Sequence, residues 1–194
     1  VTGSENTITG LGTKVTGTTE VTITGTVENE ISDKAQVVAT NGTVKVDGGT
    51  TAANTITGAD TLVQAGSAVD IDGKTNSIAA SADILADGNI TLDADESNEV
   101  IGAAKVDGAS VAMTAGTSNT ISGTDTLVTA DTTVNVQGTS NSIAAGAKVE
   151  AGTDATITAT TSNEVISGAT VSADTVAVTG PEKTITGLGT KVTG

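Results

Sequence analysis

Apolar and polar residues alternate along this chain over short stretches, and the stretches recur at a regular interval. Each interval starts with an Asn that is followed two positions later by Ile or Val. A further Val, Ile or Leu follows eight or nine positions after the Asn, and two apolar residues separated by one position complete the interval. This alternation predicts short β-strands with one buried face, whereas the 3.6-residue period of a helix is nowhere sustained.

Four columns of mostly β-branched residues are therefore predicted to form the core. The position two after the Asn holds Ile8, Ile31, Ile56, Ile78, Val100, Ile121, Ile143, Val165 and Ile185. The position eight or nine after it holds Val15, Val37, Leu62, Ile84, Val106, Leu127, Val149, Val171 and Val192. The pairs are Val21/Ile23, Val44/Val46, Val69/Ile71, Ile90/Leu92, Val111/Met113, Val134/Val136, Ala155/Ile157 and Val176/Val178. Val and Ile favour strands because their stiff χ1 angles pack well on a pleated surface.

The leading Asn residues recur about every 22 residues, and Lys183 opens a ninth interval. They are Asn6, Asn29, Asn54, Asn76, Asn98, Asn119, Asn141 and Asn163. Repetition at this period is typical of chains that stack one supersecondary unit on the next. Three short strands per interval, with Gly-containing corners between them, predict an all-β parallel β-solenoid of about eight coils, right-handed and forming a single domain over residues 1–194.

Two interpretations of the Asn residues are open at this point. If they occupy the same corner in every coil, their stacked amides can hydrogen-bond to one another along the axis, as Asn ladders do in other stacked sheets. Alternatively, each Asn is simply a turn residue that tolerates the left-handed backbone conformation. We expect the ladder, because the spacing of the column matches the coil length.

A much longer period is also present. Residues 178–194 repeat residues 1–17 at every position except two, where Pro181 replaces Ser4 and Lys183 replaces Asn6. The chain therefore reads as one unit of about 177 residues followed by the start of the next. Either the polypeptide continues the repeat beyond both ends, or separate copies stack head to tail and generate an open filament.

Composition excludes most chemistry. The chain has no His, Cys, Arg or aromatic residue, so it lacks the commonest general base, the thiolate nucleophile, the usual transition-metal ligands and the bidentate phosphate clamp. The net charge of −15 and the scattered lysines argue against nucleic-acid binding. No apolar run reaches the ~18 residues of a membrane span. We expect no enzymatic activity, no cofactor and no small-molecule substrate.

Four aspartates are weak candidates for calcium ligands: Asp70, Asp72, Asp93 and Asp95. Ca²⁺ binds six to eight oxygen atoms, and closely spaced carboxylates could supply some of them. Alternating residues of one strand point to the same outer face, so these side chains are more simply solvated charges. We expect no metal requirement.

The Thr-, Gly-, Ala-, Asp- and Asn-rich intervals with their Val and Ile columns resemble the repeat regions of bacterial extracellular β-solenoid proteins. These include large surface adhesins, haemagglutinin-like exoproteins, and the matrix or filament subunits of biofilms. The resemblance covers the whole chain and implies an extracellular or cell-surface location. It also implies a fibre shaft or stalk, with recognition carried by other regions. The Gly-Gly-x-Gly-x-Asp phrase of the calcium-binding β-roll does not occur.

We therefore expect a structural shaft whose partners are copies of itself, or adjacent repeats, stacked head to tail. The alternative is an ice-binding solenoid, because Thr-x-Thr pairs such as Thr7/Thr9, Thr55/Thr57 and Thr184/Thr186 would project regular ranks of hydroxyl and methyl groups. In the same columns, however, Glu and Ile replace Thr in other intervals.

Overall fold

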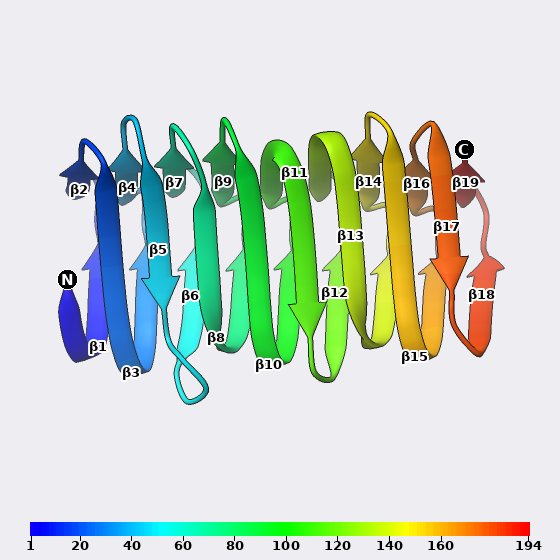
Figure 1. The fold of residues 1–194 in the computed structure, drawn as a ribbon, viewed down its shortest axis with the longest axis horizontal. Coiled ribbons are helices and arrows are strands. Elements are labelled where there is room, and N and C mark those ends of the chain that lie inside the picture. The colour runs from blue at the N-terminus through cyan, green and yellow to red at the C-terminus, as the bar shows by residue number, and fades with distance from the viewer.

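The computed structural model describes all of residues 1–194 and is a rod built from β-strands, with no helix. Nineteen strands form one continuous sheet that winds around the rod axis, and the two termini lie at opposite ends (Figure 1). The predicted fold class, an all-β parallel β-solenoid, is confirmed, with about 9 turns of ~22 residues.

Strand bounds follow the predicted intervals. The strands are β1 (Thr2–Thr9), β2 (Lys14–Gly17), β3 (Glu20–Ser32), β4 (Gln36–Ala39), β5 (Thr43–Asp47), β6 (Ala53–Thr57), β7 (Leu62–Ala65), β8 (Val69–Ala79), β9 (Asp83–Ala86), β10 (Asn89–Ile101), β11 (Lys105–Ala115), β12 (Ser118–Ser122), β13 (Leu127–Ala144), β14 (Lys148–Ala151), β15 (Asp154–Ile166), β16 (Thr170–Ser172), β17 (Thr175–Thr179), β18 (Glu182–Thr186) and β19 (Lys191–Thr193).

Each turn of the rod contributes to three faces. The Asn face contains β6, β12, β18 and the C-terminal parts of β1, β3, β8, β10, β13 and β15. The β2 face contains β2, β4, β7, β9, β14, β16, β19 and the first residues of β11 and β13. The β3 face contains β5, β17 and the remaining parts of the long strands, which bend around one corner without interruption or, in β13, around two.

Every strand pairs in parallel with the equivalent strands of the turns before and after it, and the strands at the two ends of the rod pair on one side only. The eight Asn residues and Lys183 stand in one aligned column, which defines nine rungs numbered from Asn6 (rung 1) to Lys183 (rung 9). In-register stacking follows from the sequence because a one-residue slip would move each apolar set from the core to the surface.

A continuous aliphatic core of 37 buried residues runs along the axis. The predicted columns line it, except that Ile185 of the last rung is exposed and that the prediction was wrong at Leu62 and Leu127. Both side chains are partly exposed, and Val63 and Val128, each 0% exposed, occupy the core instead. The cause is the preceding corner, which has one residue more in rungs 3 and 6 and moves the inward position from eight to nine residues after the Asn.

Two kinds of corner join the Asn face to the β2 face. A short corner has two consecutive residues with positive φ: Asp33-Lys34, Ala80-Ser81, Gly102-Ala103, Ala145-Gly146 and Ser167-Gly168. A long corner has the pattern Gly-x-x-Thr: Gly10–Thr13, Gly58–Thr61, Gly123–Thr126 and Gly187–Thr190. The hydroxyl of its Thr donates a hydrogen bond of 2.7–2.9 Å to the carbonyl four residues earlier and closes the corner.

Candidate functional site

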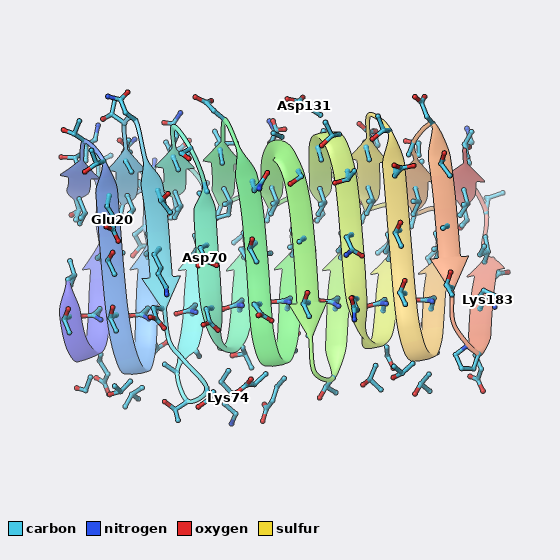
Figure 2. The ribbon with its side chains drawn as sticks, viewed as in Figure 1. Glu20, Asp70, Lys74, Asp131 and Lys183 are labelled. Atoms are coloured by element: carbon cyan, nitrogen blue, oxygen red, sulfur yellow. The ribbon has the colours of Figure 1, made fainter.

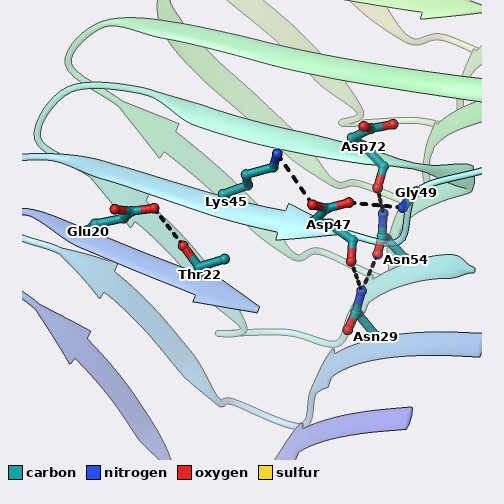
Figure 3. A network of polar contacts seen from close by, with 8 residues as sticks. All are labelled: Glu20, Thr22, Asn29, Lys45, Asp47, Gly49, Asn54 and Asp72. Atoms are coloured by element: carbon teal, nitrogen blue, oxygen red, sulfur yellow. Dashed lines mark hydrogen bonds and ion pairs between the residues drawn. The ribbon is translucent and has the colours of Figure 1, made fainter. Parts of the chain in front are cut away.

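The most extended polar feature of the molecule is the Asn column. Each Asn Nδ2 donates to the Oδ1 of the Asn in the next rung, over 2.8–3.0 Å, from Asn6 to Asn163 without a gap. The same Nδ2 also donates to a backbone carbonyl at the end of the β3 face in the next turn, over 2.7–3.1 Å. Figure 3 shows both bonds of Asn29 and the bond of Asn54 to the Asp72 carbonyl. The structure thus brings all eight predicted Asn residues together as one ladder.

Burial gives this ladder its structural importance. Asn6 is 6% exposed and the other seven are 2% exposed or less. Buried amides that lose their partners are costly, by about 1–3 kcal/mol for each unsatisfied group. Gly3 and Gly25 form an aligned pair beside the ladder, and a Cβ at Gly25 would stand 2.5 Å from the Asn29 Oδ1. The ladder therefore links turns to one another and fixes their register.

Lys183 takes the ninth position of the column and ends the ladder. It aligns with Asn163 in the parallel pairing of β15 and β18, but its Nζ donates to the carbonyl of Gly180 at 2.6 Å. Asn163 keeps its bond to the Thr179 carbonyl and has no amide oxygen ahead of it. Lys183 is exposed, at the end of the rod farthest from the N-terminus (Figure 2).

The two terminal rungs expose apolar side chains. Leu11 is 85% exposed and Leu188 is 101% exposed, each at the tip of a Gly-Leu-Gly-Thr corner. Ile185, in the Ile/Val column of rung 9, is 50% exposed, whereas Ile8 at the equivalent position of rung 1 is 6% exposed. These terminal surfaces are the largest departure from an otherwise polar exterior.

Aspartates gather on the β3 face, although not all of those selected from the sequence take part. Asp72 and Asp93 stack in register, and Asp47, which the sequence analysis did not select, precedes them in the same column. Asp70 lies in the neighbouring column between Lys45 and Thr91, and Asp95 lies at the next corner. Asp47 became visible only through the register, because the additional residues Gly48–Ala52 obscure the alignment of its turn.

The electrostatics of this column follow from its stacking. Burial raises the pKa of Asp72, and the Asp47, Asp93 and Asp70 carboxylates raise it further, while Lys45 lowers it. The Lys45 ammonium lies 3.4 Å from an Asp47 carboxylate oxygen, and this hydrogen bond raises the pKa of Lys45 (Figure 3). No group of three or more acidic residues has an arrangement that could hold a metal ion. The stacked carboxylates repel one another, and the positive charge of Lys45 partly offsets this repulsion.

The surface has no enclosed pocket. The largest hollow, about 430 Å³, is open and lies on the β2 face. Lys105 and Asp107 form a 2.9 Å ion pair within its lining, with Gln64, Leu85 and Asp131 around them. A hollow of this kind lacks the apolar walls with convergent polar groups that are typical of ligand sites.

Sequence reasoning did not single out the corner threonines, although a signal was present. Thr61 and Thr126 are 0% exposed, and each hydroxyl also accepts a backbone N–H from the preceding rung, over 3.0 and 2.9 Å. Wherever Gly stands four residues after the column position and Thr three residues after that Gly, the corner is long. That pattern would have placed both threonines and the correct core residues.

Comparison with known proteins gives no relative. No family model, no curated protein and no solved structure matches the chain. Nor does the molecule contain a helix long and apolar enough to cross a membrane.

Proposed function

We propose that the chain is a structural, non-catalytic rod: the shaft of a bacterial extracellular fibre, or a length of a giant surface adhesin. The observation that carries this proposal is the unbroken register of the Asn column through nine rungs, the last of which repeats the first in sequence. A rod whose last rung repeats its first can be extended by further repeats of the unit, and contacts of this heterologous kind generate filaments.

The rest of the molecule supports a mechanical role. Turns are joined by backbone hydrogen bonds, by the amide ladder and by a core that has no break along the axis. Asp and Glu number 23 against 8 Lys, so neighbouring rods carry like charge, which limits lateral association. Because His, Cys and Arg are absent and the hollows are open, nothing in the chain favours a catalytic or small-molecule function over this one.

Imaging tests the proposal directly. Electron microscopy of the native material should show long, thin, unbranched filaments, and fibre diffraction should give the ~4.8 Å spacing of parallel strands along the filament axis. Native material that contains only short, monodisperse particles, even when concentrated, would contradict the shaft.

The ice-binding alternative has less support. The outward column that begins with Thr7 continues through Glu30 and later Glu99, and the column that begins with Thr9 contains Ile101. The β3 face is interrupted by the aspartate column. A flat lattice of threonines is therefore absent from both faces. Measurable thermal hysteresis at millimolar protein would restore this alternative.

A further inference from the structure

The long corners follow a rule of placement along the rod. They occur in rungs 1, 3, 6 and 9, so no long corner is adjacent to another, and each one after rung 1 follows a short corner. Identical stacking of all rungs would not require such an order. The order therefore points to a contact that a short corner makes and a long corner cannot.

Hydrogen bonds identify that contact. In each of the three steps from a short to a long corner, the second residue of the short corner donates its backbone N–H to the Thr hydroxyl of the long corner. The pairs are Lys34 to Thr61 at 3.0 Å, Ala103 to Thr126 at 2.9 Å and Gly168 to Thr190 at 3.0 Å. The middle residues of the long corners donate no backbone N–H to another rung. A long corner therefore fits onto a short corner on its N-terminal side, and not onto another long one.

In rung 1 the Thr hydroxyl of this contact is present, but the N–H that would donate to it is not. The Thr13 hydroxyl donates to the Thr9 carbonyl at 2.7 Å, as its equivalents do, but it receives no N–H. Its matching neighbour is a short corner such as Ser167-Gly168 in rung 8. The long corner Gly187–Thr190 of rung 9 does not supply that neighbour.

The opposite surface of rung 9 also has a defined partner. Residues 1–17, which share all but two positions with 178–194, are covered in this structure by the turn Thr18–Ala39. In that contact Gln36 N donates to the Thr13 carbonyl at 2.9 Å, and Thr40 N donates to the Gly17 carbonyl at 3.0 Å. Thr190 and Gly194 hold the equivalent carbonyls in rung 9.

We propose that rung 9 also serves as the first rung of the next unit, so that neighbouring units share one boundary rung. The Thr18–Ala39 turn of that next unit then packs directly on rung 9. The proposal rests on the shaft function and specifies its joint. It gives an axial period of eight rungs, ~38 Å, instead of the ~43 Å that nine-rung copies stacked end to end would give. In such a rod Thr18 of the next unit follows Gly194 in the polypeptide.

Two tandem chains test the joint. In the shared-rung tandem, residues 1–194 are followed by residues 18–194, and in the duplicated-rung tandem they are followed by residues 1–194 again. Hydrogen exchange is read by mass spectrometry over residues 182–194 of the first copy in both tandems. In the second copy it is read over the Gln36 and Thr40 amides of the shared-rung tandem and over residues 1–17 of the duplicated-rung tandem. We expect the shared-rung joint to exchange as slowly as the equivalent contacts of the first copy. The two boundary rungs of the duplicated-rung joint should exchange at least ~10-fold faster, as the loss of inter-rung hydrogen bonds predicts.

The outcomes separate this inference from the proposed function. Equal or greater protection at the duplicated-rung joint overturns the shared boundary rung and leaves the shaft intact. Fast exchange at both joints contradicts end-to-end continuity itself, and with it the shaft.

A matched pair of variants in the single chain tests the corner rule on which the proposal depends. T190A should accelerate exchange of the Gly168 amide about tenfold, because its acceptor is removed. T13A should change no amide of another rung, because the Thr13 hydroxyl accepts no N–H and the Thr13 carbonyl, which accepts the Gln36 N–H, stays in place. An unchanged Gly168 amide in T190A would remove the basis of the rule.

Discussion

Rung 1 and rung 9 have almost the same sequence but different neighbours, since rung 1 is covered only on its C-terminal side and rung 9 only on its N-terminal side. Ile8 is 6% exposed and Ile185 is 50% exposed, although they are the same residue at the same position of the repeat. Asn6 is buried and bonded to Asn29, whereas Lys183 extends into solvent. The difference shows that the two sides of a rung are not equivalent.

That inequality has a physical consequence for the rod. A neighbour on the C-terminal side covers the inward Ile almost completely, and a neighbour on the N-terminal side leaves half of it in water. Most of the apolar surface that an additional rung would bury therefore lies at the rung 9 end. Burial of apolar surface contributes about 25 cal/mol per Å², so this end gains most from being covered.

The largest expected effect compares the Ile column at an interior and a terminal rung. Ile121→Ala should lower the free energy of unfolding by about 2–5 kcal/mol, because Ile121 is 0% exposed and its removal leaves a cavity. Ile185→Ala should cost less than half as much. Urea unfolding of the two variants measures both values. Equal losses would mean that rung 9 is covered in solution.

A second comparison concerns the amide ladder. Asn98→Ala should cost about 2–4 kcal/mol, because the Asn76 Nδ2 loses an acceptor and the Asn119 Oδ1 loses its donor inside the core. Asn6→Ala leaves only the Asn29 Oδ1 without its amide partner and should cost about half of that. Denaturant unfolding again provides the measurement, and similar costs at both positions would show that ladder bonds act independently of their place in the column.

Giving rung 9 the Asn that rung 1 has at the column position isolates the role of Lys183. Lys183→Asn should place an amide oxygen in front of the Asn163 Nδ2 and stabilise rung 9 by about 0.5–1.5 kcal/mol. The measurement is slower hydrogen exchange over residues 182–186. Pro181→Ser is the control, since it restores the other residue of rung 1 without touching the ladder. If the control has the larger effect, the ladder is not what distinguishes the two rungs.

The smallest expected effect compares an aspartate that has acidic neighbours on both sides of its column with one that has an acidic neighbour on one side only. Asp72 has acidic neighbours on both sides in its column, whereas Asp93 has Asp72 on one side and Thr114 on the other. Asp72→Asn should therefore stabilise the fold by about 0.2–1 kcal/mol at pH 7, and Asp93→Asn by less.

The pH dependence of this effect has a defined sign. The raised pKa means that the folded chain binds a proton at Asp72 more tightly than the unfolded chain does. The destabilisation is therefore complete above the folded pKa, and it disappears as the pH falls below the unfolded value near ~4. Unfolding curves of the wild type and Asp72→Asn should converge in that range, and a gain that persists at pH 3 would contradict this origin.

Much of the fold could be predicted from the sequence because the repeat reports the same constraint many times. Position two after the Asn is buried in rungs 1 to 8, so the Ile/Val column was correct in those rungs, and only Ile185 of the terminal rung 9 is exposed. Leu62 and Leu127 were assigned wrongly because a Leu stands eight residues after the Asn and a Val stands nine residues after it. The length of the preceding corner decides which of the two points inward. Nothing in a linear pattern reveals that length unless the Thr of the long corner is recognised as part of it.

Other features depend on relations between turns. The alignment of Asp47 with Asp72 requires the register across the additional residues Gly48–Ala52. The orientation of the ladder, in which every Nδ2 faces the C-terminal side, depends on a side-chain rotation that residue identity does not specify. The exposure of Ile185 is a property of its neighbours, since Ile8 has the same local sequence.

The uniform orientation of the Asn side chains also gives the rod an electrical direction. Eight amide dipoles point the same way, and aligned amide dipoles add head to tail as they do in a helix, where each peptide unit contributes about 3.5 D. Each dipole also polarises the next, so the hydrogen bonds strengthen one another along the row. The N-terminal end of the row presents the partial negative charge of an oxygen and the C-terminal end the partial positive charge of an N–H group. For two rods that approach end to end, this direction of the row favours the orientation in which both point the same way over the reversed one.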